Sequence, residues 1–121
     1  MNNEKWNQYI KKSKEDYRKI GHVVCPALDN APIYFNKYGW NHLLRKGRKF
    51  RDVKQLIWRL GLMNNVHKIL SDSKYISAKR TTNTRGSIYV FWKINRKING
   101  RVINVIVRKK NDGKHHFFSI F

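Results

Sequence analysis

Two turn dipeptides constrain the fold of this chain more than any other feature. Asn99-Gly100 and Asp112-Gly113 each separate two runs that are rich in β-branched and aromatic residues, and such dipeptides favour tight β-hairpin turns. Together with the linker "NTRG" and an earlier run of the same kind, they predict four antiparallel strands in chain order. The predicted strands are "KYISAKRTT" (74–82), "GSIYVFWKIN" (86–95), "GRVINVIVRKK" (100–110) and "KHHFFSIF" (114–121).

The two turns also predict which residues lie opposite each other. The first turn pairs Lys93 with Ile106, and the second pairs Ile106 with Ser119 and Arg108 with Phe117. Because side chains alternate along a strand, both hairpins sort their residues onto the same two faces. One face is apolar and is expected to form the core: Ile88, Val90, Trp92, Ile94, Ile103, Val105, Val107, Phe118 and Ile120. The other mixes cations, aromatic rings, a histidine and a hydroxyl: Tyr89, Phe91, Lys93, Ile106, Arg108, Lys110, His115, Phe117 and Ser119.

Helical periodicity marks the N-terminal half of the chain. Apolar and aromatic side chains recur at helical spacing over residues 3–20, and Gly21 is expected to end this helix. Residues 21–34 contain both prolines and are interpreted as a connector. Two further helices are predicted, over residues 36–46 with Asn36 as N-cap, and after Asp52 with a break at Gly61 or at Asn64-Asn65.

These elements predict an α+β fold. N-terminal helices would pack on one face of a four-stranded antiparallel β-meander and leave the other face free. The length of 121 residues fits one compact domain.

The net charge bears on the kind of partner. Lys and Arg number 27 and Asp and Glu number 7, which gives a net charge of +20. Such a chain is expected to meet a polyanion: nucleic acid, an anionic membrane or an acidic protein. Nucleic acid is favoured over membrane, because the charge is spread along the whole chain and no apolar run approaches the roughly 20 residues of a membrane span. The polar first 20 residues do not resemble a signal peptide, and the single Cys25 fits a reducing compartment. We therefore expect action in the cytoplasm, either of the producing cell or of a target cell.

The scarcity of acids bears on the chemistry. Two-metal nucleases need several carboxylates around ions about 4 Å apart, whereas no Glu follows Glu15 and the later Asp residues are isolated. Half a zinc site at His22 and Cys25 has no second half, and glycine-rich phosphate loops are absent. No metal and no cofactor are expected. If the chain cleaves nucleic acid, proton transfer would then fall to histidine.

Metal-independent RNA cleavage uses the 2′-OH of the RNA as nucleophile. It needs a base, an acid and cations that stabilise the charge on phosphorus. His42 is one candidate, because Arg45 and Lys46 lie three and four residues later on the same predicted helix and nearby cations lower a histidine pKa. His115 on the free sheet face is the other, whereas His116 is expected on the core side. Both have ordinary alternatives as surface residues, and the free face itself has the alternative of a solvated surface.

Two segments resemble the BECR superfamily of ribonucleases, which includes barnase, EndoU, the tRNA-cleaving colicins and RelE. They are "IYFNKYGWNHLLRKGRKFR" (33–51) and the closing "GKHHFFSIF" (113–121), and the similarity covers roughly residues 32–121. The resemblance implies a nuclease domain over residues 33–121, preceded by an N-terminal helix and connector over residues 1–32. It also implies helices on one face of an antiparallel sheet and an RNA-cleaving site on the other.

Carried over to this sequence, the resemblance assigns roles to individual residues. His42 would be base or acid, Arg80 or Lys79 and Arg108 would stabilise the phosphorane, and Ser119 would bind phosphate. Barnase-like members use a carboxylate base, which this chain lacks at a suitable position, so the base stays open between His42 and His115. The residues expected to bind RNA are Arg45, Lys46, Arg48, Arg51, Lys79, Tyr89, Lys93 and Phe117.

The expected function is a metal-independent endoribonuclease that leaves a 2′,3′-cyclic phosphate on tRNA, rRNA or mRNA. A toxin of an interbacterial, toxin–antitoxin or phage system fits this activity, and an acidic immunity protein or antitoxin would complement the charge. Two alternatives remain: a non-catalytic RNA- or DNA-binding module, and a structural or ribosome-associated basic protein.

Overall fold

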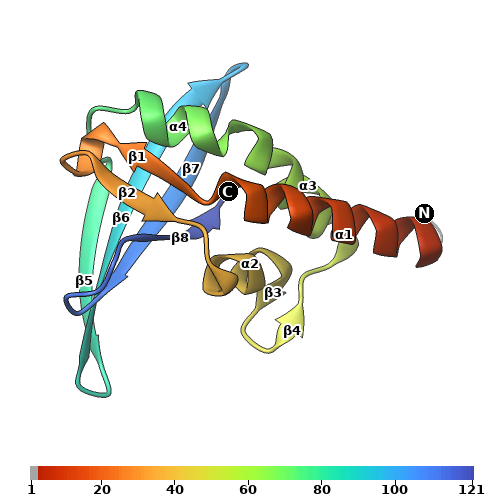
Figure 1. Ribbon diagram of the computed structural model, residues 1–121, viewed down its shortest axis with the longest axis horizontal. Helices are drawn as coiled ribbons and strands as arrows, with labels where there is room; N and C mark the ends of the chain where they lie inside the picture. The colour runs from red at the N-terminus through yellow and green to blue at the C-terminus, as the bar shows by residue number, and fades with distance from the viewer. Residues whose placement is uncertain (1–2) are drawn as a thin grey trace.

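The computed structural model describes residues 3–121 and has an α+β architecture (Figure 1). The helices are α1 (Asn3–Ile20), α2 (Lys37–Leu44), α3 (Val53–Leu62) and α4 (Val66–Asp72), with 3-10 turns η1 (Pro26–Leu28) and η2 (Met63–Asn65). The strands are β1 (His22–Cys25), β2 (Ala31–Tyr34), β3 (Arg45–Lys46), β4 (Lys49–Phe50), β5 (Ala78–Thr84), β6 (Ser87–Ile98), β7 (Arg101–Lys110) and β8 (His116–Ile120). The predicted fold class is confirmed.

The sheet is wider than the predicted meander. Six strands lie in the order β1-β2-β8-β7-β6-β5, and β3 with β4 forms a separate small hairpin. Pairing is antiparallel except between β2 and β8, where Tyr34 lies opposite His116 in a parallel arrangement. The four-stranded description was therefore incomplete, because the β1–β2 hairpin extends the sheet beside β8.

The predicted connector over residues 21–34 is wrong, since most of it forms that hairpin. Proline is rare inside sheets because it cannot donate a ladder hydrogen bond, which argued against a strand here. Pro32 is tolerated because the parallel pairing with β8 is confined to Tyr34. The predicted boundary between residues 32 and 33 thus falls within β2.

Most predicted helix ends agree with the structure, but α2 ends at Leu44 and not at residue 46, because Arg45 and Lys46 form β3. Helix α1 ends at Ile20, before Gly21 with φ 66°. The Asn36 side chain accepts hydrogen bonds from two backbone N–H groups at the start of α2, and Asp52 accepts from Gln55 N at the start of α3. Satisfying these otherwise unpaired donors stabilises both helix starts. The predicted break is found at η2.

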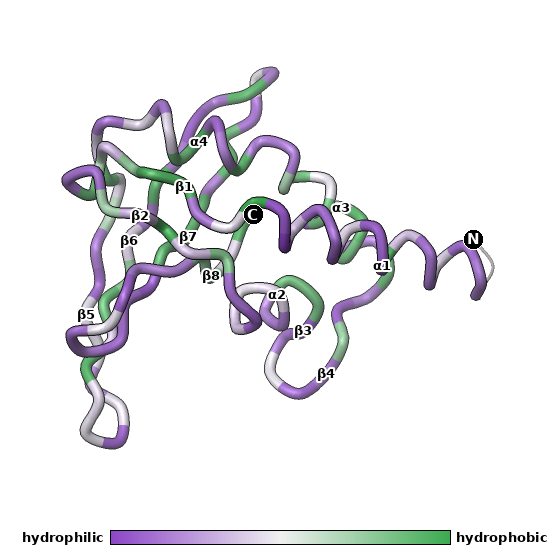
Figure 2. The backbone as a smooth tube through the Cα atoms, viewed as in Figure 1, coloured by the Kyte–Doolittle hydropathy of each residue, from purple (hydrophilic) through white to green (hydrophobic). Residues whose placement is uncertain are grey.

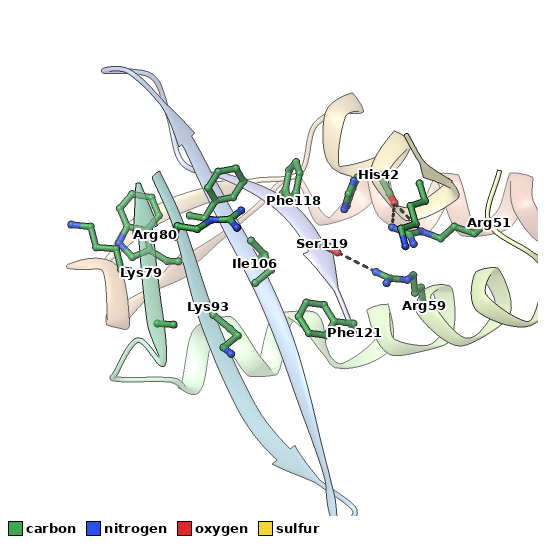
Figure 3. A pocket seen from close by; sticks show the side chains of 14 residues that line it. His42, Arg51, Arg59, Lys79, Arg80, Lys93, Ile106, Phe118, Ser119 and Phe121 are labelled. Carbon is green, nitrogen blue, oxygen red and sulfur yellow. Dashed lines mark hydrogen bonds between the residues drawn. The ribbon is translucent and has the colours of Figure 1, made fainter. Parts of the chain in front are cut away.

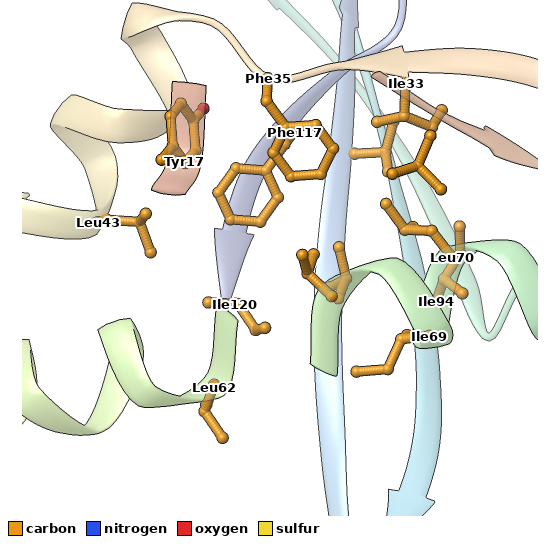
Figure 4. Close-up of a cluster of buried hydrophobic side chains, with 14 of the residues drawn as sticks. Tyr17, Ile33, Phe35, Leu43, Leu62, Ile69, Leu70, Ile94, Phe117 and Ile120 are labelled. Atoms are coloured by element: carbon orange, nitrogen blue, oxygen red, sulfur yellow. The ribbon is translucent and has the colours of Figure 1, made fainter. Parts of the chain in front are cut away.

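The core lies between the sheet and the helices α1, α2, α3 and α4, with Phe117 near its centre (Figure 4). The Phe117 ring stacks on Phe35 at 5.1 Å between centroids and meets Tyr17 edge-on at 6.1 Å. The Tyr17 hydroxyl donates to the Asn36 carbonyl at 2.6 Å, which fastens α1 to the start of α2. A Cβ at Gly39 would lie 2.5 Å from Phe117 O, so this glycine allows α2 to approach β8 closely.

Helix α1 extends away from the sheet and is hydrophilic along most of its length (Figures 1 and 2). Its buried contact is Tyr17, near its C-terminal end. No helix within residues 3–121 is long and apolar enough to cross a membrane.

The register of the first predicted hairpin is confirmed along its length, including Lys93 opposite Ile106. The predicted register of the second hairpin is confirmed at Ile106 opposite Ser119 and at the neighbouring Val105–Ile120 pair, but Arg108 lies opposite His116 and not Phe117. A β-bulge between Ile106 and Val107 separates the two registers.

The bulge reverses the predicted faces of three residues on β8. Phe117 is fully buried in the core, and the extra residue Phe118 lies on the open face with Ser119. His116 lies beside Arg108 on that open face as well. The core-facing assignments of Phe118 and His116 and the open-face assignment of Phe117 were therefore wrong. Ile88 is also wrong as a core residue, since it is exposed where β6 extends beyond the helices.

Candidate active site

A cavity of about 520 Å³ lies between the open face of strands β5–β8 and the helices α2 and α3 (Figure 3). This volume is within the range of about 300–1,000 Å³ that is common for small-ligand sites. Its wall carries His42 from α2, Arg51 from the segment before α3, and Arg59 from α3. Its floor carries aromatic and cationic side chains of the sheet.

His42 is placed by the close packing of α2 on β8. It lies three residues after Gly39, and its ring stacks on Phe118 with centroids 4.2 Å apart. Burial, the largest cause, and the charges of Arg51, Arg59 and Arg108 together lower the pKa of His42 to about 4. The imidazole is therefore neutral at pH 7 and able to accept a proton.

Two arginines are held against the wall by backbone and side-chain acceptors. Arg51 donates from Nε and Nη2 to the carbonyl of His42, at 3.3 and 3.1 Å. Arg59 donates from Nη1 to Ser119 Oγ at 3.1 Å and to the carbonyl of Ile120 at 2.9 Å. The Arg59 Nε atom is buried and has no hydrogen-bond partner within residues 3–121.

Within residues 3–121, no acidic side chain pairs with the cations of this cavity. Burial lowers the pKa of both Arg51 and Arg59, although an arginine stays protonated in proteins. The ion pairs found within residues 3–121 are Lys12–Asp16 and Arg96–Asp72, and none of the cavity arginines takes part in them. Desolvated cations without a counter-ion favour an anion as ligand.

The floor of the cavity provides apolar rings beside these cations. Arg80 lies over the Phe91 ring with Cζ 5.0 Å from the centroid, and Phe118 meets Phe91 edge-on at 5.4 Å. Lys93 and Ile106 complete the sheet side, and Lys46 lies at the helix side. Aromatic rings next to cations are suited to a nucleobase next to its phosphate.

Two of the predicted site residues, His115 and Phe117, do not line this cavity, whereas Lys79 does. The His115 ring lies against Trp92 with centroids 4.9 Å apart, and Lys79 Nζ lies over the same ring at 5.9 Å. Trp92 follows Phe91 in β6 and so points to the opposite face. His115 is thereby separated from His42, and Phe117 is in the core. Alternation along the strands, and the shifted register of β8, are the physical reasons.

Other predicted residues lie at the edges of the site. Arg108 and Tyr89 lie beyond Phe118, where Arg108 Cζ is 4.8 Å from the Phe118 centroid and 5.1 Å from that of Tyr89. Arg45 packs on Phe50 at 4.3 Å, and Arg48 is exposed in the turn between β3 and β4. The site that the structure assembles therefore contains the following predicted residues: His42, Lys46, Arg51, Lys79, Arg80, Lys93 and Ser119.

Sequence reasoning missed Arg59 and assigned Phe118 to the core. The signal for Arg59 was present, because it stands between the buried Leu56 and Leu60 on one side of α3. A cation beside the apolar stripe of a helix is carried to the edge of the core. No comparable signal existed for Phe118, since its face depends on a bulge.

Comparisons with protein-family models, with curated proteins and with solved structures found no match. Function is therefore inferred from the geometry of the side chains. Within residues 3–121, no three or more His, Cys, Asp or Glu side chains gather in a group that could hold a metal ion.

Proposed function

We propose that this chain is an endoribonuclease that uses the 2′-OH of its substrate as nucleophile. The observation that carries the proposal is the neutral imidazole of His42 among three arginines, in a cavity without an acidic side chain. A base next to a strongly cationic anion site is the arrangement that 2′-OH activation beside a phosphate requires. The resemblance to BECR ribonucleases agrees with this reading, and so does the aromatic floor.

In the proposed reaction, a phosphodiester lies against Arg51 and Arg59. His42 takes the proton of the 2′-OH, the 2′-oxygen bonds to phosphorus, and the bond from phosphorus to the 5′-oxygen breaks. The arginines stabilise the extra negative charge on the phosphorane. Ser119 Oγ accepts from Arg59, which leaves its own proton for a phosphate oxygen. We assign protonation of the leaving 5′-oxygen to water, and the products are a 2′,3′-cyclic phosphate and a 5′-OH end.

The bound phosphate also tunes the base. Its negative charge offsets the arginines that hold the pKa of His42 low, so this pKa rises when substrate binds. A base whose pKa approaches the working pH is more effective. The free protein thus keeps His42 neutral, and the complex makes it more basic.

The biological setting is a further part of the proposal. A ribonuclease with a net charge of +20 would attack the RNA of any cytoplasm that contains it. An acidic immunity protein or antitoxin that covers the arginines would complement this charge, and a toxin role would follow.

A second candidate is a binding module without catalysis. The low pKa of His42 favours it, because a base with a pKa of about 4 in the free protein is weak. This alternative retains the aromatic floor and the arginines, but it gives His42 no chemical role.

The deciding experiment is incubation of the purified protein with total tRNA and rRNA in excess EDTA. His42→Ala is compared with His115→Ala, which removes the same side chain from the opposite face of the sheet. We expect cleavage by the wild type and by His115→Ala, loss of cleavage in His42→Ala, and cyclic phosphate ends. Salt-sensitive binding without cleavage by any variant would instead establish the binding module.

A further inference from the structure

The cavity continues past Phe118 into two smaller hollows. A hollow of about 230 Å³ shares His42 and Phe118 with the main cavity. A third, of about 310 Å³, shares Tyr38 and Arg108 with the second. The three therefore form one track across the open face, and no residue that lines the second or third has an acidic side chain.

Arg108 is held at the junction of these hollows by a frame of rings. Its Cζ lies 4.8 Å from the Phe118 centroid, 5.1 Å from that of Tyr89 and 6.0 Å from that of Tyr38. Its Nε donates to His116 Nε2 at 3.0 Å. Its terminal nitrogens have no acceptor among residues 3–121, so both remain available to a ligand.

His116 fixes the direction of Arg108. It is 7% exposed, and its Nδ1 lies 3.1 Å from the carbonyl of Phe117. A carbonyl only accepts, so Nδ1 carries the proton and Nε2 is left as the acceptor for Arg108. His116 is therefore a positioning residue: the backbone sets its tautomer, and the tautomer sets the orientation of the guanidinium.

The third hollow combines this arginine with rings and further cations. Tyr38 is 56% exposed, and Lys110 Nζ lies 5.9 Å from the Tyr89 centroid. Lys114 also lines the hollow. Exposed rings beside a fixed guanidinium and flexible ammonium groups match one nucleotide, with its base on a tyrosine and its phosphate on the cations.

We propose that the Tyr38–Tyr89–Arg108 hollow is a second nucleotide subsite, which binds the nucleotide next to the one whose phosphate faces His42. The protein then takes a single strand longer than a dinucleotide. Arg108 contacts Phe118, and Phe118 stacks on His42, so the two subsites are adjacent. The proposal rests on the proposed function for the place of cleavage, but not for the binding itself.

The test uses labelled 2′-deoxy oligonucleotides, which cannot be cleaved by 2′-OH attack, and fluorescence anisotropy at fixed salt. We expect Tyr89→Ala to weaken hexanucleotide binding about tenfold, the fold-change of one lost base-stacking contact, and to leave dinucleotide binding unchanged. Tyr75→Ala is the matched control, because Tyr75 is 84% exposed and lines none of the three hollows. Its hexanucleotide affinity should equal that of the wild type.

The positioning role is tested at His116. His116→Gln keeps an acceptor for Arg108 and should retain most of the hexanucleotide affinity, whereas His116→Leu should lose as much as Tyr89→Ala. Equal loss in both His116 variants would overturn the positioning role. Unchanged hexanucleotide affinity in Tyr89→Ala, or equal affinity for a duplex of the same length, would overturn the subsite.

The two proposals fail separately. If no RNA is cleaved but Tyr89→Ala weakens hexanucleotide binding, the subsite stands and the nuclease fails. If RNA is cleaved in EDTA and Tyr89→Ala binds the hexanucleotide like the wild type, the nuclease stands and the subsite fails.

Discussion

The pKa of His42 is the property on which the proposed chemistry depends most directly. The ring is half-buried, stacked on Phe118, and exposed to the charges of Arg51, Arg59 and Arg108. Burial is the largest cause of its lowered pKa, and Arg51 is the largest of the three charges. The perturbation that isolates the electrostatic part is Arg51→Gln, which removes one charge and retains an amide donor for the carbonyl of His42.

The expected size follows from the structure. The fall from the ordinary 6.5 to about 4 corresponds to about 3 kcal/mol between the two protonation states. Partial contact of the ring with solvent screens the charges and reduces this to about 2 kcal/mol. Because burial is the largest cause of the lowered pKa, a single arginine accounts for less than half of the lowering. We therefore expect Arg51→Gln to raise the pKa of His42 by about 0.5–1.

The assay is an NMR titration of the His42 ring proton, assigned by its absence in His42→Ala. Arg101→Gln is the control, since it removes an equal charge at the exposed start of β7. Inorganic phosphate should raise the pKa of His42 in the wild type and raise it less in Arg51→Gln. Titration of His42 near 6.5 in the wild type, or an equal pKa in Arg51→Gln and wild type, would refute the electrostatic account of the site.

Three further predictions concern folding. Gly39→Ala should lower the free energy of unfolding by about 1–3 kcal/mol in urea titrations, because its Cβ would meet Phe117 O and the Tyr17 hydroxyl; Gly61→Ala, whose Cβ has open space, should not. Tyr17→Phe should cost about 1 kcal/mol by removing one of the two hydrogen bonds that the Asn36 carbonyl accepts, the other coming from Trp40 N, and an unchanged midpoint would contradict that role. The contribution of His42 to the free energy of unfolding should fall as pH falls from about 6.5 to about 4, and it should not change further below that pH. The unfolded chain binds a proton in that window that folded His42 does not, so His42→Ala should show a smaller slope.

Much of the fold could be predicted because its signals are local. The Asn99-Gly100 turn determined the register of β6 and β7 along the whole hairpin, since a two-residue turn leaves no freedom in pairing. Asn36 and Asp52 marked the starts of α2 and α3 through the same side-chain chemistry that the structure shows. The β1–β2 hairpin could not be predicted in this way, because it joins the sheet through β8, which follows about 80 residues later.

The candidate site was predicted where it depends on helices and missed where it depends on contacts between distant segments. The lowered pKa of His42 was predicted in direction but not in cause, because the sequence pointed to Arg45 and Lys46 and the structure shows burial as the largest cause. The arginines that act on it come from three separate segments, namely the stretch before α3, α3 and β7, and the chain holds 27 Lys and Arg residues to choose from. Only the tertiary fold brings Arg59 to Ser119.

The error at β8 has a specific cause in the sequence "HHFF". A shift of one residue in pairing normally moves apolar side chains to solvent and is therefore strongly disfavoured. Here a one-residue shift exchanges His115 for His116 and Phe117 for Phe118, so both registers present the same residue types to each face. The structure adopts a five-residue loop over 111–115 where a two-residue turn was predicted, and the bulge at Phe118 restores the predicted pairing at Ser119. The hydrophobic pattern is satisfied by either arrangement, and the choice rests on Phe117 filling the space between Tyr17 and Phe35. That choice also sends Phe118 to His42 and His116 to Arg108, so the core packing of one ring decides which histidine of the pair belongs to the open face.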